Sequence, residues 1–318
     1  MTLVARRVDF AVEKCPTCYG KSLCNETMSR LYVAPYPFDV VGVRKIDGED
    51  EKSVIFVQEP FAHSGTRHVG SGIQSFFRCP TKRLERRIVA LSDVNGNGDV
   101  TMKEKRTLAT TLKADRESIL LQLFPKAHGW PFLQYHGACG RVLVKEHGKH
   151  NLMYYVNESK DMRVWLAAQL LQIAFLLSDN NKNWAIYLPE LRLDNFVLSD
   201  DGEVLAININ NAIVVDAMNF ASQPIHSKDE DPPLGDDIEF NATALCTGLH
   251  RDHNFIYMCR AVGRLLRSMA TSSGNPLSDH VRDCMFYRSE TTRIDAARRL
   301  YDYLISLLPS GEDSKFFK

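Results

Sequence analysis

The feature that most constrains the fold is a long apolar helix pattern that runs directly into a loop and a short hairpin. Four aliphatic residues of segment 163–177 recur with the spacing of one helix face: Leu166, Leu170, Ile173 and Leu177. The elements expected after this helix are a loop containing Asp194-Asn195, a strand at Phe196–Leu198, a turn at Asp200–Gly202 and a strand at Val204–Ile207. A helix that feeds an antiparallel hairpin predicts a mixed α+β fold. The hairpin is either an ordinary buried element or the support of a catalytic loop.

The catalytic interpretation draws on the order of the elements. Protein kinases have a helix, then a loop H-R-D-x-x-x-x-N, then a hairpin that carries the chain to D-F-G. When Asn195 is aligned with the loop asparagine, the base aspartate falls on Glu190. The magnesium-binding aspartate falls on Asn208, roughly thirteen residues later. Phosphoryl transfer depends on the exact placement of the base and on a charged metal ligand. Glu190 and Asn195 are therefore predicted to be residues of a degenerate catalytic loop. Binding of ATP with Mg²⁺ at Asn208 is predicted to be weak or absent.

Size and charge narrow the possible functions. The chain has 318 residues, enough for one large domain or two lobes. Its 39 Lys and Arg residues equal its 39 Asp and Glu residues, so no net charge favours nucleic acid or an acidic membrane. No apolar run approaches the about 18 residues of a membrane-spanning helix, and residues 1–16 contain no apolar signal-peptide core. The composition therefore predicts a globular protein with no membrane span and no nucleic-acid partner.

The cysteines leave three interpretations open: disulfides, free thiols or zinc. There are eight cysteines, an even number, and three of them cluster near the N-terminus: Cys15, Cys18 and Cys24. The Cys15-x-x-Cys18 pair has no second pair at zinc-binding spacing, and its turn-rich surroundings do not favour a thioredoxin-like site. Three N-glycosylation sequons, at Asn25, Asn157 and Asn241, permit passage through the secretory pathway.

The loop 93–104 carries the pattern of an EF-hand calcium site, D-x-[DN]-x-[DN]-G-x₅-E, and helical patterns flank it on both sides. The predicted calcium ligands are Asp93, Asn95, Asn97, Asp99 through its carbonyl, Thr101 and Glu104. Only Asp93 and Glu104 are charged among the side-chain ligands, and we find no partner hand, so a weak dissociation constant of ~10⁻⁴–10⁻³ M is expected. The alternative is a polar Asn-Gly turn that carries acidic residues by chance.

Three segments are expected along the chain. Residues 1–30 form a cysteine-bearing N-terminal segment, 31–146 a strand-rich N-lobe that contains the 93–104 loop, and 147–318 a mainly helical C-lobe. Strands first and helices later predict a bilobal protein-kinase-like fold with an EF-hand-like insertion in the N-lobe. A literal H-R-D at His250-Arg251-Asp252 lacks the asparagine five residues on and is expected to start a helix.

The chain resembles the divergent-protein-kinase-domain family, and within it the deleted-in-autism branch. The residues that carry the resemblance are Lys14–Cys24, Cys79–Val89, Gly129–His147, Leu188–Leu198, Asn210–Asp216 and Leu245–Cys259. The block GWPF…GACGR in Gly129–His147 is the most specific of them. The resemblance implies a bilobal kinase-like fold, Golgi or extracellular residence, and disulfides in preference to zinc. It also implies an N-lobe EF-hand similar to that of the sister branch.

The sequence departs from the pattern of that family at the residues on which catalysis depends. Besides Glu190 and Asn208, Phe56 occupies the expected position of the ATP-pairing lysine, and Lys45 is the nearby candidate to replace it. No G-x-G-x-x-G loop covers the phosphates. The leader of the family does not precede Met1, which we interpret as a truncated gene model or an alternative start.

Three functions are therefore weighed. The first is a secreted or Golgi-lumenal pseudokinase that acts as a binding or signalling module, with a protein partner or receptor in the secretory pathway or extracellular space. The second is a weakly active, unconventional secretory-pathway kinase that uses Glu190, Asn195, Asn208 and Lys45. The third is a calcium-modulated structural protein in which the 93–104 loop is the functional site. Ca²⁺ is the expected cofactor.

Overall fold

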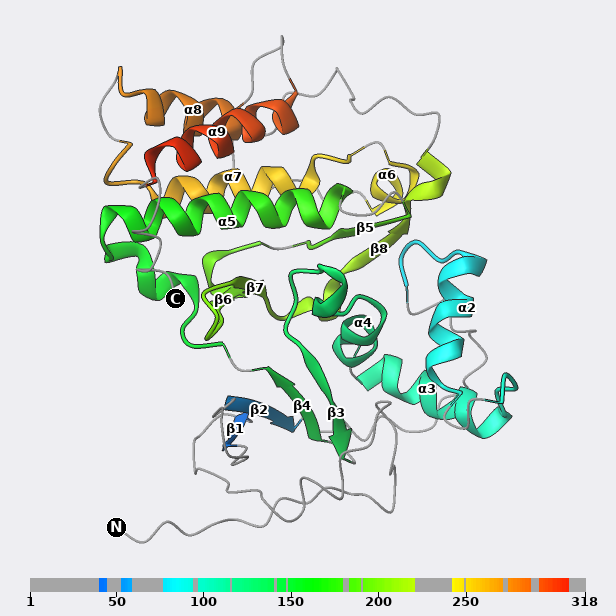
Figure 1. Ribbon diagram of the computed structural model, residues 1–318. Helices are drawn as coiled ribbons and strands as arrows, with labels where there is room; N and C mark the ends of the chain where they lie inside the picture. The colour runs from blue at the N-terminus through cyan, green and yellow to red at the C-terminus, as the bar shows by residue number, and fades with distance from the viewer. Residues whose placement is uncertain are drawn as a thin grey trace, which may run out of the picture. The chain divides into compact units, whose positions relative to one another are not determined.

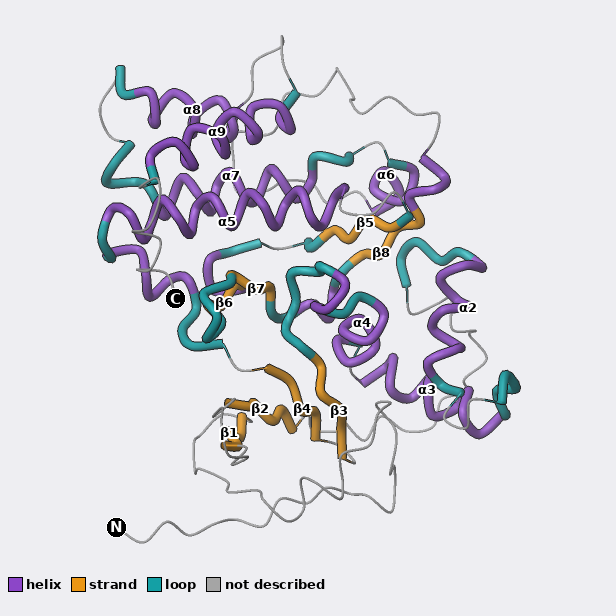
Figure 2. The backbone as a smooth tube through the Cα atoms, viewed as in Figure 1, coloured by secondary structure: helices purple, strands orange, loops and turns teal. Residues whose placement is uncertain are grey.

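The computed structural model describes residues 40–44, 53–58, 77–93, 97–114, 116–139, 142–146, 148–179, 183–189, 191–220, 242–248, 250–270, 274–286 and 292–308 (Figures 1 and 2). These residues divide into two compact units. Unit 1 takes in the described residues up to His128, Phe132 to Glu146 and Asn208–Asn210. Unit 2 takes in Gly129–Pro131, Gly148 to Ile207 and the described residues from Asn211 onward.

Unit 1 contains an antiparallel sheet of four strands. The strands, in spatial order, are β1 (Val40–Arg44), β2 (Ser53–Gln58), β4 (Val142–Glu146) and β3 (Tyr135–Cys139). The register places Ile55 of β2 opposite Lys145 of β4. The ladder between β3 and β4 is irregular between Tyr135 and Gly137, and Gly137 has a positive φ of 153°, so β3 begins with a bulge.

Among the described residues, unit 1 also contains the α-helices α2 (Lys82–Leu91), α3 (Met102–Ala114) and α4 (Glu117–Leu123). The hydroxyl of Thr81 accepts a hydrogen bond from the Leu84 amide and so caps the first turn of α2. Leu84 and Ile88 face inward one turn apart and are almost completely buried. The Arg87 guanidinium donates to the Leu123 carbonyl at 2.9 Å, which ties α2 to the end of α4.

Unit 2 is mainly helical. Its helices are α5 (Lys160–Asp179), α6 (Ala242–Thr247), α7 (His253–Leu265), α8 (Pro276–Phe286) and α9 (Arg293–Leu307). The predicted apolar face of α5 is confirmed: its four aliphatic residues are all buried. Helix α5 packs against α7 and α9 (Figure 1). Phe175 of α5 meets Phe255 of α7 and Tyr301 of α9 edge-to-face, with ring centroids 4.9 and 6.4 Å apart.

Four short strands lie beside these helices. Strand β5 (Trp184–Tyr187) pairs with β8 (Ile213–Asp216), and β6 (Phe196–Leu198) pairs with β7 (Val204–Ala206), both antiparallel. The β6–β7 pair is the hairpin expected from the sequence, and it is buried throughout. Four short 3₁₀ helices of the described chain matter below: η3 (Leu152–Asn157), η4 (Leu193–Asn195), η5 (Ile209–Asn211) and η6 (Ala217–Phe220).

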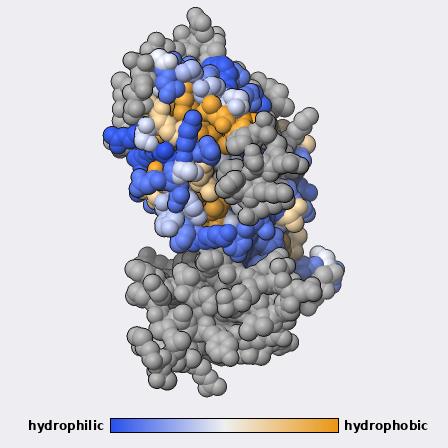
Figure 3. Space-filling view, turned by 60° about the vertical axis from the view of Figure 1, so that its left-hand side comes forward, coloured by the Kyte–Doolittle hydropathy of each residue, from blue (hydrophilic) through white to orange (hydrophobic). Residues whose placement is uncertain are grey.

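Surface hydropathy is mixed on the face drawn in Figure 3, where hydrophobic side chains show among hydrophilic ones. Helix α5 is long enough to approach a bilayer thickness but carries Lys160, Asp161, Arg163 and Asp179. In the described residues no helix combines the length and the apolar character needed to cross a membrane.

Candidate functional site

The β6–β7 hairpin is held from two sides. On one side, Gln169 of α5 accepts from the Val204 amide at 2.9 Å and donates to the Gly202 carbonyl at 3.2 Å, so it binds both ends of the turn. On the other side, residues 149–151 add to the edge of β6, with the Lys149 amide donating to the Leu198 carbonyl at 2.7 Å. Gly148 precedes this segment because a Cβ there would lie 2.3 Å from a Val197 methyl carbon. The hairpin is therefore a fixed base for the residues on either side of it.

Asn195, the aligned loop asparagine, is the last residue of η4. Its side-chain oxygen accepts from the Arg192 amide at 3.1 Å, and its own amide donates to the Arg192 carbonyl at 2.9 Å. Its carbonyl accepts from the Ile207 amide at 2.9 Å, so the loop is joined to the residue before Asn208. Of the two predicted loop residues, Asn195 has this geometry, whereas Glu190 lies outside the described residues.

The chain entering the loop is clamped by Asn254, a residue that the sequence analysis missed. Asn254 is fully buried in the first turn of α7. Its side-chain oxygen accepts from the Leu188 amide at 3.2 Å, and its nitrogen donates to the Ile186 carbonyl at 2.8 Å and the Ser178 hydroxyl at 3.1 Å. A buried amide that uses both its donors and its acceptor fixes its partners closely. Asn254 therefore holds the end of β5 two residues before position 190.

Asn208, the aligned metal position, belongs to unit 1 and has a left-handed backbone with φ 59°. Asparagine tolerates this conformation better than most residues because its short polar side chain can satisfy the local backbone. The next residue, Ile209, is buried, and Asn210 accepts a hydrogen bond from the Glu117 amide at 2.8 Å through its side-chain oxygen. The first amide of α4 is thus satisfied by the segment that carries Asn208.

A buried ion pair joins helix α4 to the central strand β4. The ammonium group of Lys145 lies 2.8 Å from a carboxylate oxygen of Glu117, and the two side chains are only 10% and 8% exposed. Charged groups at this depth are found almost only in pairs, because an isolated charge would lose its hydration without compensation. This pair was not predicted from the sequence. A signal existed in Lys145, which directly follows the apolar run Val142–Val144 in β4, because a charged side chain that packs against a helix needs a partner.

The neighbouring residue of β4, Glu146, makes a second pair. Its carboxylate lies 2.8 Å from the ammonium of Lys126 and accepts from the Gln134 amide at 3.0 Å. Lys145 and Glu146 bind different partners because successive side chains of a strand point to opposite faces. The predicted phosphate cation, Lys45, lies outside the described residues, and of Phe56 only the backbone in β2 is described.

The 93–104 loop joins α2 to α3, and two of its three carboxylates, those of Asp93 and Glu104, bind loop backbone. The Asp93 carboxylate accepts from the Gly98 amide at 2.8 Å and the Asn97 amide at 3.3 Å, and the Asn97 side chain accepts from the Asp99 amide at 2.9 Å. At the other end, Glu104 accepts from the amide and the hydroxyl of Thr101, at 2.8 and 2.7 Å. Gly98 has φ 82°, a turn that only glycine makes freely.

The predicted calcium ligands therefore lie in one loop, but not all of them are among the described residues. Asn95 lies outside the described residues. Across the residues that are described, no three His, Cys, Asp or Glu side chains form a group able to hold a metal ion. The calcium site remains a prediction that rests on the pattern and on the turn geometry.

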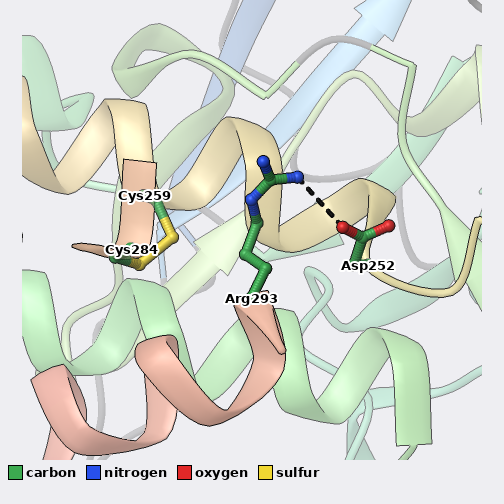
Figure 4. Close-up of a disulfide and its surroundings, with 4 residues drawn as sticks. All are labelled: Asp252, Cys259, Cys284 and Arg293. Atoms are coloured by element: carbon green, nitrogen blue, oxygen red, sulfur yellow. Dashed lines mark hydrogen bonds and ion pairs between the residues drawn. A yellow bond between two sulfur atoms is a disulfide. The ribbon is translucent and has the colours of Figure 1, made fainter. Parts of the chain in front are cut away.

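Disulfide bonds are confirmed for the cysteines that can be described. Cys259 of α7 and Cys284 of α8 are bonded, with Cα atoms 5.5 Å apart (Figure 4). Cys79 and Cys246 also take part in disulfides, so the four cysteines whose side chains are described are all bonded. The N-terminal cluster at Cys15, Cys18 and Cys24 lies outside these ranges.

The literal H-R-D is a helix start, as expected. Asp252 immediately precedes α7, and its carboxylate accepts from Arg293 at 2.9 Å (Figure 4). Arg293 is only 2% exposed at the first turn of α9. The motif therefore joins two helices of unit 2 instead of forming a catalytic loop.

Comparison with known proteins places these features in a family. A family profile described as the protein-kinase domain of FAM69 matches residues 109–286, more than half of the chain. Divergent protein kinase domain 2A of Homo sapiens is 29% identical over 263 residues, which cover 74% of this chain and 61% of that protein. The same protein of Xenopus tropicalis is 29% identical over 269 residues, covering 76% and 63%. Divergent protein kinase domain 2B of Bos taurus is 28% identical over 240 residues, covering 71% and 55%.

The chain thus spans less than two thirds of the length of these relatives. The matched region, 109–286, includes α4, the strand pair β3–β4, α5 and the hairpin that leads to Asn208. The predicted kinase-like domain of mixed helices and small sheets is confirmed by this match. The chain belongs to the FAM69 family of divergent protein-kinase domains.

Proposed function

We propose that this chain acts in the Golgi lumen or outside the cell as a pseudokinase, a kinase-like module that binds or signals to a protein partner or receptor. The observation that carries the proposal is Asn208. It aligns with the magnesium-binding aspartate when Asn195 is matched to the loop asparagine, and its left-handed backbone suits asparagine and aspartate alike. The backbone therefore keeps a conformation that would accept aspartate, while the side chain has lost the negative charge that holds Mg²⁺.

The Lys145–Glu117 pair supports a kinase-like frame around this altered position. In active kinases a lysine on a strand pairs with a glutamate on the neighbouring helix and stays oriented toward the phosphates. Here the lysine lies on the strand that follows the helix, whereas the kinase lysine precedes it. We infer that Lys145 takes over the role of the lysine missing at Phe56. A kinase-like module that keeps a lysine for the phosphates but lacks the carboxylate that binds Mg²⁺ is better suited to binding a partner than to catalysing phosphoryl transfer.

A weakly active kinase is the alternative that the same pair favours. It would need Glu190 as the base, Asn195 and Asn208 as metal ligands, and Lys145 or Lys45 on the phosphates. Amide oxygens carry no net charge, and Mg²⁺ in nucleotide sites is bound through one or two carboxylates. Such an enzyme would therefore turn over far more slowly than the 1–100 s⁻¹ that is roughly typical of kinases.

The decisive experiment restores the charge. Asn208→Asp should give the protein a Mg²⁺-dependent rise in Tm with ATP, because a ligand at 100 times its Kd stabilises by about 2.7 kcal/mol. The wild type and Asn211→Asp, which adds the same charge three residues later, should show no such rise. The measurement is a thermal melt with ATP, with and without Mg²⁺. A Mg²⁺-dependent shift of several degrees in the wild type that disappears in Asn195→Ala would overturn the pseudokinase proposal.

The proposed compartment rests on the disulfides. Disulfides persist in oxidising compartments and are rare in the cytosol. Cys79, Cys246, Cys259 and Cys284 are all bonded, and the Cys259–Cys284 bond lies in the core of unit 2 with both residues fully buried. A core that depends on such a bond forms properly only where the bond can form. The protein partner or receptor that we propose would meet the chain in the same compartment.

Calcium binding at the 93–104 loop is proposed as a second function, in which the loop modulates the fold of unit 1. Supporting it are the position of Asp93 just after α2, the position of Glu104 within the first turn of α3, and the positive φ of Gly98 between them. These are the places that an EF-hand loop gives to its first ligand, its bidentate glutamate and its obligatory glycine. Both carboxylates already converge on loop amides.

Calorimetry at millimolar Ca²⁺ tests this second function. One Ca²⁺ per chain is expected for the wild type, and Glu104→Gln should weaken binding most because Glu104 supplies two oxygens. Glu85→Gln, in α2 outside the loop, is the matched control and should bind as the wild type does. If the wild type gives no binding heat, or if Glu104→Gln binds Ca²⁺ as tightly as the wild type, the loop is only a polar turn and the calcium proposal is wrong.

A further inference from the structure

The short helix η3 exposes two large side chains in succession. Within Leu152–Asn157, Met153 is 49% exposed and Tyr154 is 60% exposed. Single exposed apolar residues need no explanation, but two in succession on a rigid turn favour something that covers them. The turn is rigid because the Tyr154 amide donates to the Asn151 carbonyl at 3.0 Å and the Glu158 amide to the Tyr155 carbonyl at 3.1 Å.

The ring of Tyr154 is fixed in place by its neighbours. His150 stacks on it with ring centroids 4.2 Å apart and an interplanar angle of 17°. Tyr155, which is itself buried, meets it edge-to-face at 5.3 Å. With His150 stacked on the ring and more than half of the side chain open to solvent, Tyr154 is an ordered, exposed aromatic platform.

Asn157 lies on the same side of η3 as this platform. In a 3₁₀ helix there are three residues per turn, so side chains at positions i and i+3 eclipse one another, about 6 Å apart along the axis. Tyr154 and Asn157 stand in this relation, and Asn157 is exposed at the last residue of the helix. Asn157 also begins the sequon Asn157-Glu158-Ser159, and Ser159 is exposed too.

We propose that Asn157 carries an N-linked glycan whose first sugar packs on the exposed part of the Tyr154 ring. The inference rests on the secretory location proposed above. In the transfer, the bond from the anomeric carbon of a lipid-pyrophosphate-linked oligosaccharide to its phosphate oxygen breaks. A carbon–nitrogen bond to Nδ2 of Asn157 forms, Nδ2 loses a proton, and the lipid pyrophosphate leaves with the electron pair. The C–H face of the sugar then covers the electron-rich face of the ring and removes apolar surface from water.

The site is tested in the full chain expressed behind a secretion leader in cultured animal cells. Glycosidase release in ¹⁸O-labelled water marks each former glycan site by mass, so the peptide containing Asn157 should carry the label. Asn157→Gln should remove one glycan from the protein. Asn151→Gln, an exposed asparagine at the other end of η3 and outside any sequon, should remove none. Asn157→Gln is preferred to Ser159→Ala because the Ser159 hydroxyl accepts from the Met162 amide at 3.3 Å.

The packing on Tyr154 is tested by a double-mutant cycle, with Asn25→Gln and Asn241→Gln in every variant so that only one sequon remains. Loss of the glycan through Asn157→Gln should lower Tm by about 2 °C or more when Tyr154 is present. In a Tyr154→Ala background the same change should shift Tm by much less, because the platform is gone.

The outcomes separate this inference from the proposed function. A secreted, disulfide-bonded protein with no glycan on Asn157 overturns the inference and leaves the secretory location intact. Retention in the cell with free thiols overturns both. A glycan on Asn157 whose loss has the same effect with and without Tyr154 overturns the packing on the ring.

Discussion

Two lysine–carboxylate pairs close to one another in sequence differ in nearly every physical respect. Lys145 and Glu117 are 2.8 Å apart with side chains 10% and 8% exposed, whereas Lys149 and Asp200 are 3.7 Å apart and 48% and 55% exposed. The first pair joins a helix to the central strand of a sheet, and the second lies on the surface beside the β6–β7 turn. A count of ion pairs would treat them as equal.

The difference shows what burial does to a charge pair. In water, two exposed charges gain little from each other, because solvent screens them and the long side chains lose freedom. In the interior, the attraction is stronger, but each charge has also lost its hydration, so the pair as a whole stabilises little while the removal of one member is costly. Lys145–Glu117 is therefore better regarded as a constraint on where α4 lies relative to β4 than as a source of stability.

The largest expected effect comes from breaking the buried pair. Lys145→Met leaves the Glu117 carboxylate buried without this ammonium group, and we expect unfolding free energy to fall by ~3–5 kcal/mol. Urea denaturation, together with hydrogen exchange of the α4 amides, measures the loss. The double variant Lys145→Met with Glu117→Leu should recover most of it, since an apolar pair replaces both charges. A double variant as unstable as the single one would show that the pair stabilises the fold outright.

The next largest effect is a pH dependence of the unfolding free energy that comes from His253, a buried histidine that stays neutral in the folded protein. Burial lowers the pKa of His253 from its usual 6.5 to about 4, although the nearby Asp252 opposes the shift. Between these values the unfolded chain binds the proton more readily than the folded one, so stability is fully present above pH 6.5 and falls as the pH drops toward 4. The loss over that window is on the order of 3 kcal/mol.

Denaturant unfolding at pH 7.5, 5.5 and 4.5 measures this dependence. His253→Gln should be less stable at pH 7.5 but should lose less stability between pH 7.5 and 4.5 than the wild type. The comparison between the two proteins cancels the contribution of carboxylates that titrate in the same range. Equal pH slopes in the wild type and the variant would mean that His253 is not the group responsible.

The smallest expected effect belongs to the exposed pair. Lys149→Ala should change unfolding free energy by less than about 1 kcal/mol, and the change should shrink further in 1 M salt, where the Debye length is roughly 3 Å. The same urea titration serves, with Lys149→Gln as a control that keeps the length of the stem. A loss as large as that of Lys145→Met would end the distinction drawn between the two pairs.

The local elements were determined by the sequence itself. The spacing of Leu166, Leu170, Ile173 and Leu177 determines one buried face of α5, and the turn chemistry after it produces the β6–β7 hairpin. Thr81 caps the first turn of α2 through its own hydroxyl, a contact between residues three apart. The alignment that places Asn208 at a metal position also depends only on local spacing. Patterns of this kind are readable because the residues that interact are three or four apart in a helix, or directly opposed across a short turn.

The partners of the buried polar groups were decided only by the tertiary structure. Glu117 and Lys145 are 28 residues apart, and Asn254 reaches Leu188 across 66 residues. A single sequence shows no periodicity or motif that pairs these residues. They meet because the helices and strands that carry them pack together, and the order of those elements along the chain does not predict which of them become neighbours. From the sequence, Lys145 in strand β4 and Asn254 at the start of α7 indicate only that each needs a hydrogen-bonding or charged partner if it is buried. The tertiary structure provides that partner. A buried charge or amide without a partner would destabilise the folded state by an amount comparable to the whole free energy of unfolding.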